Sequence, residues 1–232
     1  MSESESVLSG KGKNDYEKYL KVPQLLDCQK APEELAHRDE LMFQIVHQTA
    51  ELWMKLQIFE LQEARARMER EACLGAMTLL RRVTQIQNVM TQQIHILESM
   101  NPWEYQDVRR VLGQGSGLES PGFQRLVVLG PTLWRPYEEL LKGRGIEIDQ
   151  VITEKEQYHD LFLLAEALAD YDESFQIWRF HHLKLIEREI GGKVMSLKGR
   201  AIDFLSENIE QRFYPELWEV RNRLTRRSGT SY

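Results

Sequence analysis

Two adjacent histidines, His181 and His182, lie at the centre of a predicted helix that runs from Asp172 to Gly192. At helical spacing, His181 also faces Lys184 and Arg188, whereas His182 shares its face with apolar residues. Those apolar residues are Phe175, Trp178, Leu185 and Ile186. His182 is therefore the more buried of the two, either as a hydrogen-bonded core histidine or as a ligand.

A second predicted helix carries His47, on the same stripe as Phe43, Ala50 and Met54. A further apolar stripe runs beside it, so the middle of this helix is expected to lie deep in the molecule, with His47 facing a cavity. One neutral imidazole can ligate a haem iron, while a second on the opposite face hydrogen-bonds a substrate. His47 and His182 form a candidate pair of this kind, although helical spacing alone does not show that they converge.

Tyr105 and Arg109 lie four residues apart on a short helix that Asn101 and Pro102 are expected to open, with Glu104 completing a capping box. An arginine on such a face can hold a carboxylate through a charge-assisted pair of about 1.5 to 3 kcal/mol. The alternative is a surface arginine that pairs with Glu104 or with its other acidic neighbour, Asp107.

Two Glu-x-x-His patterns, Glu34 to His37 and Glu156 to His159, keep a different metal hypothesis open. In four-helix di-iron proteins such pairs project inward beside a Glu from each of two other helices. Charged neighbours flank both patterns, so a solvated helix face is the simpler interpretation.

These residues must be positioned by helices, because no segment shows sustained strand alternation. The fold class is predicted to be all-α, a single-domain helical bundle. The predicted helices cover residues 32–71, 74–100, 102–112, 123–141, 149–170, 172–192 and 201–224, with breaks at Gly130-Pro131 and at Pro215.

The main buried stripe of the helix over 32–71 is expected to be Met42, Ile45, Thr49, Leu52, Leu56 and Phe59. One face of the next is expected to bury Met77, Leu80, Val83, Ile86 and Met90.

The composition narrows the class of protein. A net charge of −6 predicts no nucleic-acid partner, and no helix has the one-sided basic stripe of a membrane-surface helix. Cys28 and Cys73 lie far apart without a CxxC pattern, which argues against a zinc site, a disulfide framework and covalently attached haem. Reduced thiols fit a cytoplasmic protein best. Residues 1–14 have no apolar core and are interpreted as a flexible tail, neither a signal peptide nor a spanning helix. The helical domain is predicted to span residues 15–226, with a short tail over 227–232.

Several long stretches, in matching order, resemble the tryptophan 2,3-dioxygenase family and together cover most of Tyr16 to Arg223. They are HRDELMFQIVHQTAELWMKLQIFEL, WRFHHLKLIEREIGG, RFYPELWEVR, YEKYLKVPQLLDCQ and EYQDVRRVLG. The resemblance implies an all-helical oxidoreductase, usually a homotetramer, with non-covalent haem b. Such an enzyme cleaves the indole C2=C3 bond of L-tryptophan with O2.

The resemblance also implies roles for individual residues. His182 matches the axial ligand of the haem iron, and His47 matches the distal histidine that meets the indole N–H. Phe43 matches an aromatic wall of the pocket, and Tyr105 with Arg109 matches the pair at the substrate carboxylate. An N-terminal arm that completes the neighbouring subunit's pocket is matched by Tyr16, Tyr19 and Leu20.

The chain departs from the family pattern in three places. The family's glycine-rich loop over the amino-acid head group is replaced by Met195 to Arg200, where Ser196 keeps a hydroxyl for substrate binding. The oxygen-pocket motif is altered but retains Ser116 and Gly117, and the chain is short between Gly130 and Asp149. Two outcomes therefore stay open: dioxygenation of tryptophan or a derived indole, and monooxygenation of a substituted indole in natural-product biosynthesis. A di-iron protein and a non-enzymatic helical scaffold remain as further alternatives.

Overall fold

The computed structural model of the chain describes residues 8–113, 115–191 and 211–229. All regular secondary structure in these ranges is helical, which confirms the all-α prediction. The α-helices are α1 Asp15–Leu20, α2 Val22–Leu26, α3 Glu40–Glu69, α4 Cys73–Leu97, α5 Pro102–Val111, α6 Pro121–Leu129, α7 Trp134–Arg144, α8 Ile148–Thr153, α9 His159–Ile190 and α11 Pro215–Arg227. Three 3-10 turns accompany them: η1 Pro32–Glu34, η2 Gly117–Glu119 and η3 Gly130–Leu133.

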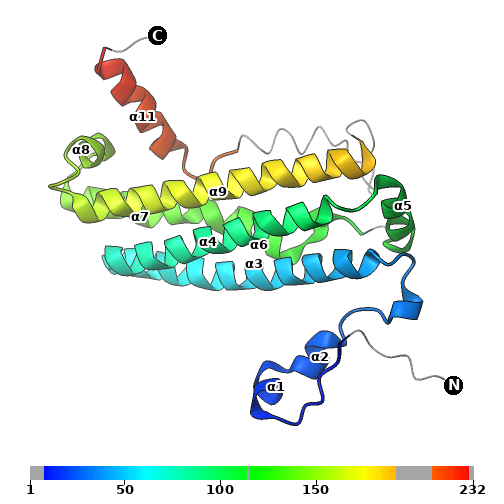
Figure 1. Cartoon of the computed structure of the whole chain (residues 1–232). Helices are drawn as coiled ribbons and strands as arrows, with labels where there is room; N and C mark the ends of the chain where they lie inside the picture. The colour runs from blue at the N-terminus through cyan, green and yellow to red at the C-terminus, as the bar shows by residue number, and fades with distance from the viewer. Residues whose placement is uncertain (1–7, 114, 192–210, 230–232) are drawn as a thin grey trace.

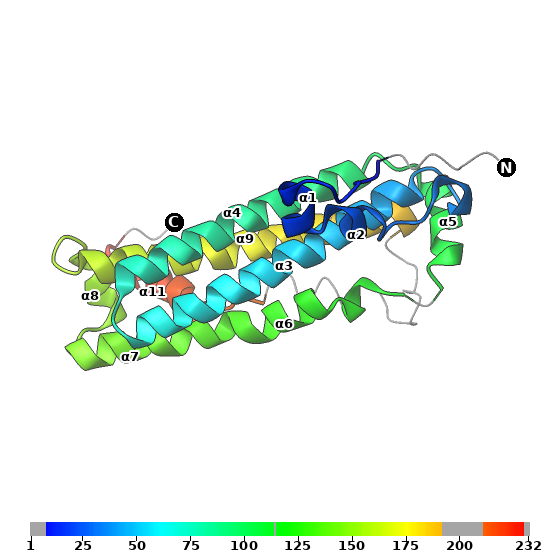
Figure 2. The same ribbon diagram turned by 90° about the horizontal axis from the view of Figure 1, so that it is seen from below.

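Three long helices, α3, α4 and α9, lie side by side and form the body of the molecule (Figure 1). The run from α6 through η3 to α7 lies along α3 and closes the bundle on a fourth side (Figure 2). Helix α5 crosses one end of the bundle, where α9 finishes, and α8 with α11 lies at the other end. Both histidine-bearing helices are thus continuous rods held on either side of α4.

The core face of α4 is the predicted one. Met77, Leu80, Val83, Ile86 and Met90 are all buried, with at most 6% of each side chain exposed. Their spacing of three and four residues forms a single stripe that packs between α3 and α9. This part of the sequence reasoning is confirmed.

On α3 the prediction of the main buried stripe was wrong. Ile45, Leu52 and Phe59 are 43%, 52% and 67% exposed. The neighbouring stripe is buried instead, because α4 and the α6–α7 run both pack on that side of the helix. Its buried members are Val46, Met54, Gln57, Leu61, Ala64 and Met68.

Helix α3 begins at Glu40, eight residues later than predicted. The Glu40 carboxylate accepts hydrogen bonds from Lys30 Nζ at 2.6 Å and from the Ala36 amide at 2.7 Å. These contacts hold the preceding segment in an irregular path in which only Pro32–Glu34 makes a 3-10 turn. A buried carboxylate satisfied by the loop therefore replaces the first turns of the expected helix.

The expected separation between a helix over 149–170 and a second over 172–192 was also wrong. Helix α8 ends at Thr153, and α9 then runs without interruption from His159 to Ile190. No glycine or proline lies near residues 170–172, so nothing in the local sequence stops the helix there. The predicted break at Gly130-Pro131 is present as η3, and the helix predicted after Pro215 is present as α11.

Asp172, in the middle of α9, ties the C-terminal segment to the bundle. Its carboxylate is fully buried and accepts hydrogen bonds from Trp218 Nε1 at 2.8 Å and from the Phe213 amide at 2.9 Å. The Tyr214 amide lies 3.4 Å from its second oxygen. One carboxylate thus satisfies three donors of the segment that leads into α11.

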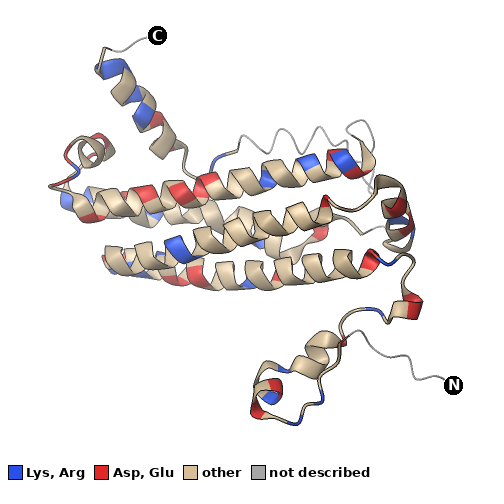
Figure 3. Ribbon diagram, viewed as in Figure 1, with Lys and Arg blue, Asp and Glu red and all other residues tan. Residues whose placement is uncertain are grey.

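Charged residues of both signs are interspersed along the helices (Figure 3). The arginines of α11 are paired with acids: Arg221 with Glu166 at 2.7 Å, and Arg223 with Asp149 at 2.7 Å. The basic end of the chain is therefore neutralised within the fold. Across the described ranges, every helix is too short or too polar to cross a membrane.

The Asp172 carboxylate has a fourth donor, Gln176 Nε2, at 3.0 Å from Oδ1. We expect Asp172→Asn to lower the free energy of unfolding by about 3 kcal/mol, because an amide offers one acceptor oxygen to four donors and each unpaired buried donor costs about 1 to 3 kcal/mol. Urea denaturation followed by circular dichroism measures the change. Asp170→Asn, at an exposed position on the same helix, is the matched control and should change stability by less than about 0.5 kcal/mol. Equal stabilities for the two variants would contradict the anchoring role.

Candidate functional site

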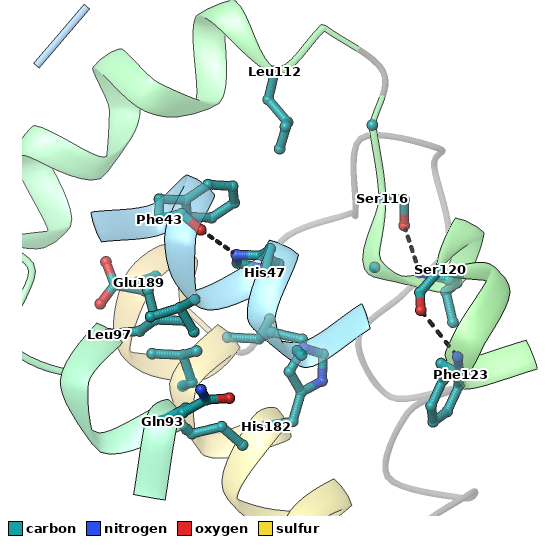
Figure 4. A pocket seen from close by; sticks show the side chains of 18 of the residues that line it. Phe43, His47, Gln93, Leu97, Leu112, Ser116, Ser120, Phe123, His182 and Glu189 are labelled. Carbon is teal, nitrogen blue, oxygen red and sulfur yellow. Dashed lines mark hydrogen bonds between the residues drawn. The ribbon is translucent and has the colours of Figure 1, made fainter. Parts of the chain in front are cut away.

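A cavity of about 290 Å³ lies inside the bundle, between α3, α4 and α9 and towards the end that α5 crosses. Its walls are largely apolar, and its volume is close to the lower bound of about 300 Å³ for small-molecule pockets. The apolar lining includes Val46, Met54, Met90, Ile94, Leu97, Phe123, Trp178 and Leu185. Both His47 and His182 face this cavity, from α3 and α9 respectively (Figure 4).

His182 presents an uncharged imidazole to the cavity. Its ring stacks on Trp178 with centroids 5.4 Å apart and planes 10° apart, as their spacing on one helix face predicts. Burial, with a smaller contribution from the nearby His47, lowers the pKa of His182 to about 4. No hydrogen bond joins this ring to another described residue. A neutral imidazole with a lone pair turned to an apolar space is a suitable ligand for a soft or borderline metal.

His47 has a defined tautomer. Its Nδ1 lies 2.7 Å from the Phe43 carbonyl oxygen, which can only accept, so Nδ1 carries the proton. Burial lowers the pKa of His47, against the opposing effects of the Phe43 carbonyl and of Glu51. The ring is therefore neutral near pH 7 and its Nε2 is a hydrogen-bond acceptor. His47 as a whole residue is exposed to solvent, and it lines the cavity.

Helix α5 brings Tyr105 and Arg109 to the same cavity. The Asn101 side chain caps the helix by accepting from the Trp103 amide at 2.8 Å, as predicted. The Tyr105 ring lies 6.1 Å from that of Phe43, which itself lies 4.0 Å from His47. These rings form a continuous aromatic wall.

The acidic neighbours of Arg109 have partners of their own. Asp107 binds Arg110 at 2.5 Å, and Glu104 lies 3.9 Å from His37 Nε2. Glu104 therefore does not complete the predicted capping box. Arg109 is the one Lys or Arg among the described residues that line the cavity.

Ser116 and Gly117 also line the cavity, on the segment that joins α5 to α6. Gly117 is close to His182 on α9. A Cβ at position 117 would stand 3.7 Å from His182 Cε1 and 3.8 Å from His182 Nε2. The absence of a side chain leaves the ring edge accessible. Farther along, Ser120 caps α6 by accepting from the Phe123 amide at 3.0 Å.

Three predicted substrate-binding residues lie away from this cavity. Tyr16, Tyr19 and Leu20 are 70%, 87% and 46% exposed on α1, which projects from the bundle together with α2 (Figure 1). They line no part of the cavity of their own chain. Ser196, with the rest of the altered loop, falls outside the described residues.

Sequence reasoning missed the two carboxylates of the cavity, Glu51 and Glu189. Glu51 is a structural group, since it accepts from the Ser120 hydroxyl and, at 3.1 Å, from the Gly122 amide. Glu189 is 8% exposed, and its Oε2 has no hydrogen-bond partner. A signal was available: Glu189 follows His182 by seven residues, two helical turns along the same face.

The residues of the di-iron hypothesis are not brought together. The Glu34–His37 pattern precedes α3 near α5, whereas Glu156–His159 precedes α9 at the opposite end of the bundle (Figure 1). Within the described ranges, two clusters have metal-ligand spacing: His95, Glu98 and His181, and His37, Asp39 and Glu104. Neither combines the two predicted patterns, and neither lines the cavity.

Comparison with known proteins agrees with this geometry. The sequence model of the family described as tryptophan 2,3-dioxygenase matches residues 2–131. A tryptophan 2,3-dioxygenase of Serratia proteamaculans (strain 568) is 31% identical, over 96% of this chain and 97% of that protein. Proteins of the same name from Saccharopolyspora erythraea and Bacillus thuringiensis (strain Al Hakam) are each 30% identical, over 90% and 97% of this chain and 92% and 100% of their own lengths. The chain belongs to the tryptophan 2,3-dioxygenase family.

Proposed function

We propose that the protein is a haem-dependent dioxygenase that uses O2 to cleave the indole C2=C3 bond of tryptophan or of a tryptophan-derived indole. The observation that carries this proposal is the pair of neutral imidazoles, His47 and His182, which face one apolar cavity from different helices. Family membership supplies the reaction class, and the cavity supplies groups suited to it.

The residues present fit a haem b. His182 is an uncharged nitrogen donor without a competing hydrogen bond, and the walls around it are apolar. Cys28 is exposed and Cys73 lies at the far end of α4, and neither lines the cavity, so the haem would be held without a thioether link. When bound, the haem supplies the redox chemistry with O2.

His47 and Phe43 would position the indole. The unprotonated Nε2 of His47 can accept a hydrogen bond from the indole N–H, because the Phe43 carbonyl fixes the proton on Nδ1. The Phe43 ring, tilted by 32° against His47, would offer an aromatic face to the substrate. Holding the reactants in one orientation is the largest contribution that such a site can make without a reactive side chain.

Arg109 and Tyr105 would hold the substrate carboxylate. Both face the cavity from one turn of α5. Burial raises the pKa of Tyr105, so its hydroxyl stays protonated and donates a hydrogen bond. The apolar walls exclude water from the reacting end, while these two polar groups define the end that receives the charged part of the substrate.

Haem reconstitution followed by 18O2 labelling tests the function. The wild-type chain should bind one haem with a Soret band and convert L-tryptophan to a product carrying two labelled oxygen atoms. His182→Ala should lose the stoichiometric band and the product, because it lacks the iron ligand, whereas the neighbouring His181→Ala should retain both. One labelled atom would instead indicate monooxygenation, and an unchanged band in His182→Ala would reject the assignment of the ligand.

The tautomer of His47 predicts the effect of methylating the indole nitrogen. Wild-type protein should bind 1-methyltryptophan at least about fivefold more weakly than L-tryptophan, the value of one hydrogen bond of about 1 kcal/mol. His47→Phe should remove this preference without loss of haem, as judged by equilibrium titration of the haem spectrum. A preference that survives in His47→Phe would assign the indole N–H to another partner.

The exposed arm supports assembly into a homo-oligomer, for which we propose a tetramer. Tyr16 and Tyr19 have no buried environment in their own chain, and large aromatic side chains of this exposure are typical of interfaces. The arm projects from the bundle (Figure 1), and in the proposed oligomer it contacts a neighbouring copy.

Light scattering should give the molar mass of a tetramer for the wild type and a smaller mass for a Tyr16→Ser, Tyr19→Ser double variant. A Leu74→Ser variant, which changes an exposed apolar residue at the start of α4, is the control and should keep the wild-type mass. A monomeric wild type would contradict the role of the arm.

A further inference from the structure

Glu189 is a buried side chain, and one oxygen of its carboxylate has no hydrogen-bond partner among the described residues. Only 8% of the residue is exposed, and Oε2 accepts no hydrogen bond. Burying an ionised carboxylate without a partner is costly, and native proteins normally pair such groups with a cation or a donor. The side chain lines the cavity (Figure 4), so the missing partner can be a ligand.

The other carboxylate of the cavity, Glu51, has a structural role and serves as a comparison for Glu189. Both oxygens of Glu51 are used, one by the Ser120 hydroxyl and the other by the Gly122 amide at 3.1 Å. Those contacts fix the start of α6. Glu189 has no comparable task in the described residues, so its burial has no structural explanation.

Glu189 lies beside the groups that would recognise a carboxylate. Gln106 Nε2 reaches the Glu189 carbonyl oxygen at 3.5 Å, which places this turn of α9 against α5. The charge of the Glu189 carboxylate contributes to the raised pKa of Tyr105, which precedes Gln106 on α5. Arg109 follows one turn later and lines the same cavity. An anionic and a cationic side chain therefore flank one end of the cavity from adjacent helices.

Burial raises the pKa of Glu189, and Arg188, on the exposed side of α9, opposes this effect only in part. A cation in the cavity would stabilise the ionised carboxylate through a charge-assisted hydrogen bond. Such a cation can be the ammonium group of a substrate. The ammonium would then lie at Glu189 while the aromatic end of the same substrate occupies the space beside His47.

Resting on the proposed function, we propose that Glu189 is the binding subsite for a protonated amine of the substrate, and that it sets specificity for indoles that carry one. Arg109 would bind the carboxylate of an α-amino acid, and Glu189 would bind its ammonium group. Glu189 is then the residue of this chain that favours an indole with an amine over an indole acid without one.

Calorimetric titration of the haem-loaded protein under anaerobic conditions tests this with three ligands: L-tryptophan, tryptamine and indole-3-propionate. Glu189→Gln should weaken binding of L-tryptophan and tryptamine by about tenfold to a hundredfold, the range for losing one charge-assisted hydrogen bond, and leave indole-3-propionate unchanged or tighter. Arg109→Gln should show the complementary pattern, weakening the two carboxylates and sparing tryptamine.

Glu187→Gln is the matched control, because Glu187 lies two residues away, outside the cavity lining, and pairs with Lys184 at 2.7 Å. It should change none of the three affinities. Equal losses for all three ligands in Glu189→Gln, or an unchanged ratio of L-tryptophan to indole-3-propionate, would overturn the amine subsite while leaving the proposed function in place. A wild-type protein that takes up no haem or binds none of the indoles would instead reject the proposed function itself.

Discussion

The site depends on keeping two imidazoles uncharged while they face the same apolar space. Each protonated ring would have to be accommodated without water, which burial makes costly, and each would also repel the other. Burial accordingly lowers the pKa of both His47 and His182. What distinguishes them is the second contact of each ring: a carbonyl oxygen fixes the proton of His47, whereas an indole face supports His182 and leaves its nitrogens without a bond. The His47 ring is thus suited to accept a hydrogen bond, and the His182 ring is suited to bind a metal.

Helix α9 connects this requirement to the rest of the fold. Over its length it carries Asp172, which anchors the C-terminal segment, then His182 at the cavity, and finally Glu189 at the end that α5 crosses. A continuous helix keeps these side chains at fixed rises of 1.5 Å per residue. A break near residue 171 would allow the anchored half and the cavity half to move independently. The uninterrupted helix is therefore part of how the site is positioned, as is the packing of α4 between α3 and α9.

The sequence predicted the all-α class, the buried face of α4, the cap at Asn101 and the shared face of Trp178 and His182, because all of these depend on residues within a few turns of one another. It did not predict which apolar stripe of α3 is buried, since that choice is made by α4 and α6, which lie elsewhere in the chain. The start of α3 depends on contacts between Glu40 and a preceding loop, and no local propensity reports them. The resemblance to the family brought Phe43, Tyr105 and Arg109 into the candidate site, and all three line the cavity. It gave no indication of Glu189, whose Oε2 is seen to have no hydrogen-bond partner only in the folded structure.

The distribution of polarity in the cavity separates two tasks. Around the histidines the walls are aliphatic and aromatic, which suits a planar cofactor and an indole and admits little water. Arg109 and Glu189 lie at the end beside α5, while the third charged side chain of the described lining, Glu51, accepts hydrogen bonds from the start of α6. Binding energy from a charged head group can thus orient the ring without placing a charge next to the reacting bond. If the proposed roles hold, an exchange of Arg109 or Glu189 changes which head group is recognised while the two histidines stay in place.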